Sequence, residues 1–487
     1  MIYSILKIIG FVLAGVTVLF FTILFYRGCS ARKKPALQRW HDAPEWQDNL
    51  FQNEYANFTA YFAAEKKFLD DIYNDVQLIT ATSYNRYTLN NPSSPYVKGN
   101  NLNASFELLP EVKEIQGGIL LVHGLKDSPY HLLAIGQIFA DNGYYVLGLR
   151  LPGHGTVPGA LLNVSWKDWY AATQFGARMV LKKIENVKGS KFYVGGFSTG
   201  AALTLRYVLD AVADKDLRVP DKLLLLSPAI GVNPFAEVTD WHKLISWIPF
   251  FEKFKWIDVK PEYDPFKYNS FPKNAADQVF DLTKANWKLI EKIAKDETKK
   301  EKMPPIYAFQ SRVDATVKTD KLLEMFAKIA PEQSELLLFD VNRVFESAMK
   351  EKLTAQFPDS EQLKAIKAKV MVVSNRAKSN QAGFGSNVEI KTLSLDKNEE
   401  IQSVSELETL IDIEWPESVF ALSHVCIPIS PDDRYYGKES LLGSINAKGE
   451  HKVLLIGDDL TRLRYNPFFN IIKNRLEISF VNSDESK

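Results

Sequence analysis

The sequence predicts an α/β fold with a mostly parallel central sheet and helices on both of its faces. Between Gly117 and Asp340, short apolar segments alternate with longer segments whose apolar residues recur at helical spacing. Strands that are apolar throughout are typical of parallel sheets, because helices bury both of their faces. Ligands of such sheets bind beyond the carboxyl ends of the strands, so we expect a functional site at that edge.

The expected elements follow one another along this part of the chain. The strands are Ile119–Val122, Tyr144–Leu149, Phe192–Val194, Leu223–Leu226, Ile306–Phe309 and Leu336–Phe339. The helices are His131–Asn142, Ser165–Glu185, Thr199–Val212 and Thr319–Ile329, and Gly143 closes the first of them.

Two longer segments interrupt this alternation. Residues 231–302 lie between two of the strands and are rich in aromatic side chains: Trp241, Trp247, Phe250, Phe251, Phe254, Trp256, Tyr263, Phe266, Tyr268, Phe271 and Trp287. Such rings could line an apolar pocket or form the segment's own core. The second segment, residues 342–416, is expected to contain a strand pair at Val370–Val373 and Val388–Leu393.

The N-terminal segment has the properties of a membrane anchor. An uncharged apolar run from Ile8 to Tyr26 has the length that crosses a bilayer as one helix. A cleaved signal peptide would have a shorter apolar core followed by small residues. We therefore expect residues 1–34 to form an uncleaved single-pass anchor. More basic residues follow the span than precede it, which puts the main body in the cytoplasm, with the periplasmic or lumenal side as the alternative.

Residues 35–115 form an extension between this anchor and the core. The part from Pro35 to about Val76 is expected to be helical, because its aromatic and aliphatic residues recur at helical spacing. The part from Thr82 to Gly99 is polar and rich in turn residues, so it is expected to be a loop.

Composition argues against several classes of function. Lysine plus arginine equals aspartate plus glutamate at 59 each, so the chain lacks the positive charge that favours nucleic acid. The two cysteines, Cys29 and Cys426, cannot build a disulfide framework or a cysteine-rich zinc site. We expect no metal, no cofactor and no nucleic-acid partner.

A nucleophilic serine is predicted at position 198. The strand Phe192–Val194 leads into Gly195-Gly196-Phe197-Ser198-Thr199-Gly200 and then into a helix. This G-x-S-x-G pattern, between a strand and a helix, is the sharp turn that exposes a serine for attack on an acyl carbon. The glycines are needed because side chains would clash in so tight a turn.

The same chemistry needs donors for a developing oxyanion. The strand at Ile119–Val122 leads into His123-Gly124-Leu125, and the N–H groups of Leu125 and Thr199 are expected to point at one oxygen. His123 itself is interpreted as a structural residue that shapes this loop, because the base follows the serine in this chain order.

A histidine base and an orienting acid are expected later in the chain. His424 ends the expected strand Val419–Ser423 and is the favoured base, with His451 as the alternative. Asp314 follows the strand Ile306–Phe309 and is the favoured acid, with Asp340 after the next strand as its competitor.

Taken together, these motifs resemble the α/β-hydrolase family, and within it the monoacylglycerol lipase and serine aminopeptidase-like hydrolases. The resemblance rests on His123-Gly124, Leu151-Pro152-Gly153-His154-Gly155, the sequence around Ser198, Arg312-Val313-Asp314 and Leu422-Ser423-His424. It implies Ser198, Asp314 and His424 as a catalytic triad, Leu125 and Thr199 as oxyanion donors, and His154 as structural.

The resemblance also implies a division of the chain. Residues 116–487 would form the hydrolase domain, with a cap at about 231–302 and a second insertion at about 342–416. The sequence departs from the family in the length of chain between the acid and the histidine. This departure leaves the position of His424 less fixed than that of Ser198.

The function expected from these features is hydrolysis of carboxylic esters by a membrane-anchored serine hydrolase. The aromatic cap suggests apolar or lipid ester substrates. A peptidase or thioesterase with the same triad is the first alternative, and a membrane-tethered binding protein without activity is the second.

Overall fold

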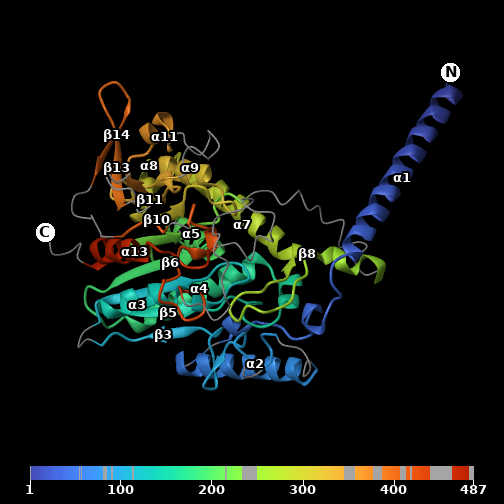
Figure 1. Cartoon of the computed structure of the whole chain (residues 1–487), viewed down its shortest axis with the longest axis horizontal. Helices are drawn as coiled ribbons and strands as arrows, with labels where there is room; N and C mark the ends of the chain where they lie inside the picture. The colour runs from blue at the N-terminus through green and yellow to red at the C-terminus, as the bar shows by residue number, and fades with distance from the viewer. Residues whose placement is uncertain are drawn as a thin grey trace.

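A ten-stranded mixed sheet forms the centre of the molecule in this computed structural model (Figure 1). The structure describes residues 2–53, 55, 58–79, 85–88, 91–111, 115–213, 216–232, 249–344, 357–376, 387–405, 413–416, 419–438 and 463–481. The sheet has the order β14-β13-β12-β11-β10-β7-β6-β4-β5-β3. Its strands from β5 to β12 run parallel, whereas β3, β13 and β14 are antiparallel to their neighbours.

The bounds of eight of the ten sheet strands agree closely with the predicted ones, whereas β3 and β14 were not predicted. They are β3 (Phe106–Leu108), β4 (Gly117–Val122), β5 (Tyr144–Leu149), β6 (Lys191–Phe197), β7 (Lys222–Leu226), β10 (Ile306–Ser311), β11 (Glu335–Phe339), β12 (Lys369–Arg376), β13 (Asn387–Leu395) and β14 (Ile401–Ser405). Short hairpins lie outside the sheet: β1 (Tyr96–Val97) with β2 (Asn100–Asn101), and β8 (Trp256–Asp258) with β9 (Phe271–Pro272).

Helices cover both faces of the sheet, and each face has its own apolar core. Alternate residues of β4 divide between them: Leu120 and Val122 face one core, and Ile119 and Leu121 the other. The first core is closed by α2 (Phe58–Ile79), α4 (Trp166–Lys183), α5 (Thr199–Val212), α7 (Lys273–Ile293), α9 (Thr319–Ile329) and α11 (Ser360–Ala365). The second is closed by α3 (Leu133–Asp141) and α13 (Phe469–Leu476). The predicted fold class is confirmed.

Shorter helical turns connect or extend these elements. They are η1 (Arg39–His41), η2 (Leu50–Gln52), η3 (Pro129–Leu132), η4 (Pro158–Leu162), η5 (Pro249–Lys255), α8 (Glu297–Lys300), η8 (His424–Cys426) and η9 (Glu477–Val481).

The N-terminal helix α1 (Ile2–Arg32) projects away from the rest of the molecule (Figure 1). It is long and apolar enough to cross a membrane, and its most apolar part is not buried against the rest of the molecule. A signal sequence near the N-terminus can also be this long and apolar, so this helix alone does not separate the two roles.

Three details differ from the sequence prediction. The helix expected from Pro35 begins only at Phe58, because η1 and η2 interrupt the chain before it. The strand expected at Val419–Ser423 is irregular, and two of its carbonyl groups accept hydrogen bonds from Asn342 instead of a neighbouring strand. The second insertion also belongs to the sheet, because β12 pairs in parallel with β11 from Leu336↔Val370 to Phe339↔Val373.

Candidate active site

Ser198 lies in the sharp turn between β6 and α5. Its φ of 53° and ψ of −115° lie outside the regions that L-residues favour, so the turn stores backbone strain. The turn is possible because Gly196 and Gly200 flank it. A Cβ at Gly196 would lie 2.4 Å from the carbonyl carbon of Gly200. The Ser198 N–H donates to the carbonyl oxygen of Leu226 at 2.9 Å, which fixes the turn at the carboxyl edge of the sheet.

His424 lies directly beside this serine. Its Nε2 is 2.9 Å from Ser198 Oγ, and its Nδ1 is 2.7 Å from Asp314 Oδ2. An ionised carboxylate can only accept, so Asp314 favours the tautomer with the proton on Nδ1. The lone pair of Nε2 then faces the serine hydroxyl, as a general base requires. The structure therefore brings the three residues expected from the sequence into one hydrogen-bonded chain.

Asp314 is held for this contact by its own loop. Its second oxygen, Oδ1, accepts the N–H groups of Thr316 at 2.8 Å and Val317 at 2.9 Å. These bonds leave Oδ2 directed at His424.

The competing acid, Asp340, has different partners. Its carboxylate binds Arg312, Arg343 and Ser374 at 2.6 to 3.0 Å. Burial raises the pKa of Asp340, but these bonds and the charge of Arg343 outweigh burial and hold that pKa below its usual value. The alternative base, His451, lies outside the described residues.

The expected oxyanion donors lie on two adjacent backbone segments. Thr199 is the first residue of α5, and the N–H groups of a helix's first turn have no partner within the helix. Leu125 follows β4 in the neighbouring loop. Gly200 allows α5 to begin against that loop, since a Cβ there would lie 1.9 Å from the carbonyl oxygen of Val122. The helix dipole of α5 adds positive potential at the same place.

His123 shapes this loop and takes no part in the hydrogen-bonded chain at Ser198. Its Nδ1 donates to the carbonyl oxygen of Gly124 at 2.8 Å, and its Nε2 accepts the N–H of Leu151 at 3.0 Å. Burial, reinforced by His154, lowers the pKa of His123 well below its usual value, so the ring is neutral and can both donate and accept. These contacts support the structural interpretation of His123.

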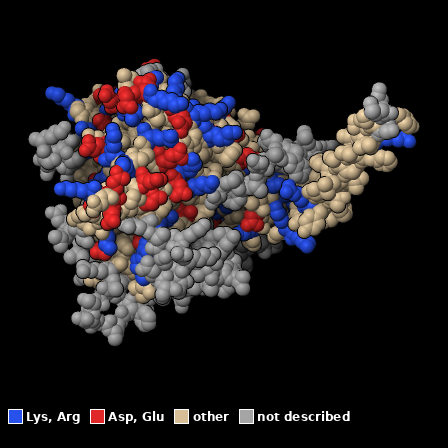
Figure 2. All heavy atoms as spheres, turned by 90° about the horizontal axis from the view of Figure 1, so that it is seen from above, with Lys and Arg blue, Asp and Glu red and all other residues tan. Residues whose placement is uncertain are grey.

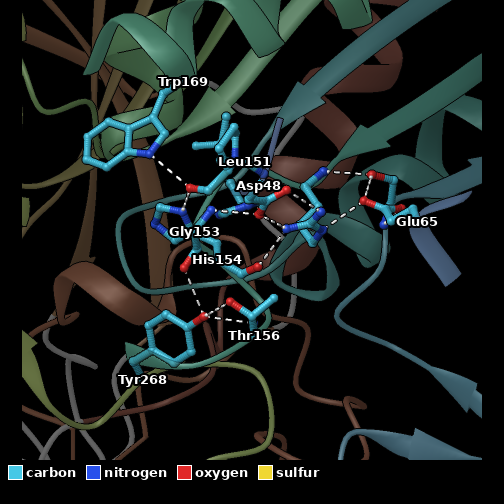
Figure 3. Close-up of polar contacts among 12 residues, drawn as sticks. Asp48, Glu65, Leu151, Gly153, His154, Thr156, Trp169 and Tyr268 are labelled. Atoms are coloured by element: carbon cyan, nitrogen blue, oxygen red, sulfur yellow. Dashed lines mark hydrogen bonds and ion pairs between the residues drawn. The ribbon is translucent and has the colours of Figure 1, made fainter. Parts of the chain in front are cut away.

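The segment Leu151–Thr156, which contains His154, is held from several sides (Figure 3). Trp169 donates to the carbonyl oxygen of Pro152 at 3.1 Å. The hydroxyl of Tyr268 donates to the carbonyl oxygen of Gly153 at 3.0 Å and accepts the N–H of Thr156 at 2.7 Å. Burial lowers the pKa of His154 to about 4, which agrees with a structural role.

Arg150 is a buried charge at the start of this segment that the sequence analysis did not single out. It forms a two-pronged pair with Asp48, at 2.6 and 3.0 Å, and binds Glu65 at 2.8 Å (Figure 3). Its Nη1 also donates to the carbonyl oxygen of His154 at 3.0 Å. Both carboxylates come from the extension before the core. That extension therefore holds the segment Leu151–Thr156 in place, and the first residue of this segment donates its N–H to His123.

Of the eleven aromatic residues of the expected cap, four are buried, five are half-buried and two lie outside the described residues. Phe254, Trp256, Phe266 and Tyr268 are buried and so form part of the molecule's own core. Trp241 and Trp247 lie outside the described residues. The helix α7 packs on α5, because Asn286 donates to the carbonyl oxygen of Ala202 at 2.8 Å. Residues 273–293 of the expected cap therefore belong to the helical layer of the core.

The cap also touches the loop of the oxyanion donors. Lys267 lies 2.8 Å from the buried carboxylate of Asp127, and the Tyr268 N–H donates to the carbonyl oxygen of Lys126 at 2.8 Å. Among the described residues, no cluster of histidine, cysteine and carboxylate side chains could hold a metal ion.

Comparisons with known proteins agree with this architecture. Residues 113–340 match the serine aminopeptidase family S33. Over 116 residues the chain is 32% identical to a thermostable monoacylglycerol lipase of Bacillus sp. (strain H-257). That match covers 24% of this chain and 44% of the lipase, so the chain spans less than half of its curated relative. The expected resemblance to the α/β-hydrolases, in the branch of the monoacylglycerol lipases, is confirmed.

Two solved structures show a partial likeness to the chain. One is described as LipS and LipT, two metagenome-derived lipolytic enzymes, with 19% identity and a TM-score of 0.36 over 49% of this chain and 88% of the other. Another is a soluble variant of monoglyceride lipase from Saccharomyces cerevisiae, with 18% identity and a TM-score of 0.35 over 48% and 81%.

Proposed function

The chain carries an α/β-hydrolase core of the monoacylglycerol lipase-like branch, and from that premise we propose that it is a membrane-anchored serine hydrolase that cleaves carboxylic esters. The observation that carries the proposal is the hydrogen-bonded chain from Ser198 through His424 to Asp314, at 2.9 and 2.7 Å. Nucleophile, base and orienting acid are the groups that acyl transfer needs.

The proposed reaction has two halves. His424 Nε2 takes the proton of Ser198 as Oγ attacks the ester carbonyl, and the N–H groups of Leu125 and Thr199 bind the oxyanion. The imidazolium, stabilised by Asp314, then gives its proton to the leaving alkoxide, and an acyl-enzyme remains. Water, deprotonated by His424, attacks this acyl group and releases the acid, which restores the serine hydroxyl.

Esters are favoured over peptides with a free amino terminus by the charges of the cap. Such a peptidase would need a carboxylate in the cap that is available to the substrate's ammonium group. The buried cap carboxylates in the described residues are already engaged. Glu262 accepts the N–H groups of Asn269 and Ser270 at 3.0 and 2.8 Å, and Asp264 accepts the hydroxyl of Tyr436.

Lipid esters are the proposed substrate class. Two observations favour them: the curated relative is a monoacylglycerol lipase, and α1 is long and apolar enough to hold the catalytic domain at a bilayer. We also propose that the domain lies on the cytoplasmic side, as the basic residues after the span suggest.

A fluorophosphonate probe tests the proposal, because it labels activated serines. The full chain in detergent should be labelled, Ser198→Ala should abolish labelling, and His424→Ala should reduce its rate by a factor of about 10³ or more. Monoacylglycerols and p-nitrophenyl esters of increasing acyl length would then define the preferred substrate. Folded wild-type protein that takes no label would contradict the proposal and favour a binding protein.

A further inference from the structure

The end of α1 packs against the cap segment η5. Phe25 stacks on Phe250 with ring centroids 6.0 Å apart, and Leu24, Ala31 and Phe254 share one small apolar cluster. Gly28 makes the approach possible, since a Cβ there would lie 2.4 Å from Phe250 Cε1. The α1 helix and the cap therefore meet at the C-terminal end of the apolar stretch of α1 and in the turns that follow it.

Basic side chains gather at this junction (Figure 2). They come from the end of α1 and the segment after it (Arg27, Arg32, Lys33, Lys34) and from the cap and the start of α7 (Lys253, Lys255, Lys273). We call these seven residues the basic collar. Arg32 lies over the Phe250 ring at 5.2 Å, and Lys253 Nζ donates to the carbonyl oxygen of Lys34 at 2.8 Å. Lys34 in turn donates to the carbonyl oxygen of Trp256.

The collar brings like charges close to one another. Burial, and then the charges of Lys34 and Arg27, lower the pKa of Lys273 to about 8. Burial also lowers the pKa of Lys34, with Asp258 opposing and Lys253 adding to this effect. Asp258 is itself paired with Lys260 at 3.0 Å. An anion at the collar would relieve the repulsion among these cations.

From this arrangement we propose that the collar binds the headgroups of anionic phospholipids in the membrane that α1 crosses, and so holds the cap against the bilayer surface. The proposal rests on the proposed membrane anchoring. Residues 8–26 span roughly 30 Å as a helix, which is about the thickness of the hydrocarbon core. The collar then lies at the depth of the lipid phosphates, and Phe250 lies where aromatic side chains favour the interface.

The consequence for the site is a fixed orientation of the cap. Anionic lipid would thus act as a positioning partner for the enzyme, separate from the ester at Ser198.

Native mass spectrometry of the full chain tests the proposal. The protein, in detergent, is offered equal amounts of phosphatidylglycerol and phosphatidylcholine, and the lipids retained are counted. A basic side chain near an anionic surface contributes about fivefold to binding. Wild type should therefore prefer phosphatidylglycerol, and Lys253→Gln with Lys273→Gln should reduce that preference by about tenfold or more.

A matched variant changes the same number of lysines on exposed positions of α7, Lys284→Gln with Lys288→Gln, and should keep the wild-type preference. An equal loss in both variants, or no preference in wild type, would overturn the proposal. A melting temperature near that of wild type shows that each variant folds.

The two proposals fail in different ways. Phosphatidylglycerol preference without fluorophosphonate labelling would refute the hydrolase and leave the collar intact. Fluorophosphonate labelling without phosphatidylglycerol preference would refute the collar and leave the hydrolase intact. An intact mass that lacks the α1 residues would show a cleaved signal sequence and overturn the collar together with the anchor.

Discussion

Two aspartates follow neighbouring strands of the sheet, and their partners give them different roles. Asp314 contacts His424, whereas Asp340 pairs with Arg312 and Arg343. We expect Asp314→Asn to lower the rate of acylation by a factor of about 10³–10⁴, because the amide would favour the wrong tautomer of His424. Stopped-flow measurement with p-nitrophenyl butyrate, after a check of folding, gives this rate.

Asp340→Asn is the matched control. It should lower stability, because two half-buried arginines lose a charged partner, but molecules that remain folded should acylate at close to the wild-type rate. A rate loss confined to Asp340→Asn would show that Asp340 is the orienting acid.

Gly200 gives a second prediction at the scale of single residues. A Cβ at this position would meet the backbone of Val122 and His123 at 1.9 to 2.5 Å, and backbone cannot move aside as a side chain can. Gly200→Ala should therefore displace the start of α5 from the oxyanion loop and slow acylation by about 10²–10³. Gly195→Ala, which meets the side chains of Leu224 and Leu121 at 3.0 and 3.2 Å, should cost stability with a much smaller effect on rate. Equal rates in both variants would contradict this account.

The sequence predicts single residues where the signal is local. Ser198 stands in a short motif whose glycines are needed for its turn, so its position follows from its neighbours. Arg150 has no such motif. Its partners Glu65 and Asp48 lie 85 and 102 positions away, and an arginine with distant carboxylates has no characteristic spacing. Only the three-dimensional contacts of Arg150 show that its buried charge holds the segment Leu151–Thr156 in place.

At the scale of elements, α2 and the segment around Asp48 hold the segment Leu151–Thr156 in place through their ion pairs with Arg150. Without the Glu65 carboxylate, Arg150 would keep Asp48 as its charged partner, and the loss of a hydrogen bond to a charged group costs about 1.5–3 kcal/mol. We expect Glu65→Gln to destabilise the protein by that order and to lower kcat more than it raises KM, because the His123 loop loses its brace. Urea titration and ester kinetics measure the two effects.

A carboxylate on the exposed side of the same helix serves as the control. Asp71 pairs with Lys67 on the surface, where such pairs contribute about 0.3–0.5 kcal/mol. Asp71→Asn should therefore change stability and kinetics little. If Glu65→Gln behaved like Asp71→Asn, the extension would be dispensable for the site.

The elements also show which patterns sequence reasoning can interpret. The ends of the apolar strands and of the amphipathic helices between them were predicted within a few residues, because the spacing of apolar residues reflects which side chains are buried. The segment Val419–Ser423 has an equally apolar pattern but is irregular, because Asn342 takes up two of its carbonyl groups. The short strand β3 was missed, since three residues carry too little periodicity to identify a strand.

At the scale of the whole molecule, the sheet extends beyond the part that the sequence suggested. The chain between Asp314 and His424 contributes β12 in parallel and β13 and β14 in antiparallel orientation. The long segment between the acid and the base therefore forms further strands of the sheet. Asp314 and His424 nevertheless meet at the carboxyl edge of the parallel strands. Pairing between strands of different segments depends on tertiary contacts, which a single sequence does not report.

The buried histidines make the stability of the whole molecule depend on pH. Burial lowers the pKa of His41 and of His154 to about 4, so both rings are neutral in the folded protein. In the unfolded chain each would bind a proton below about pH 6.5. Stability is then complete above pH 6.5 and is lost as the pH falls towards 4, by about 2 kcal/mol for each ring at pH 5.

Urea titrations of the full chain at pH 7.5 and pH 5 test this dependence. His41 bonds Gln38 and Ser270 and lies apart from Ser198, so it can be changed without touching the proposed chemistry. His41→Gln should be less stable than wild type at pH 7.5, yet it should lose about 2 kcal/mol less between the two pH values. An unchanged acid loss in this variant would show that His41 is already protonated in the fold or that other groups dominate. Carboxylates such as Asp127 cannot account for a loss in this range. Burial raises the pKa of Asp127 but Lys267 and His131 lower it to about 2, so its contribution to stability disappears only well below pH 5.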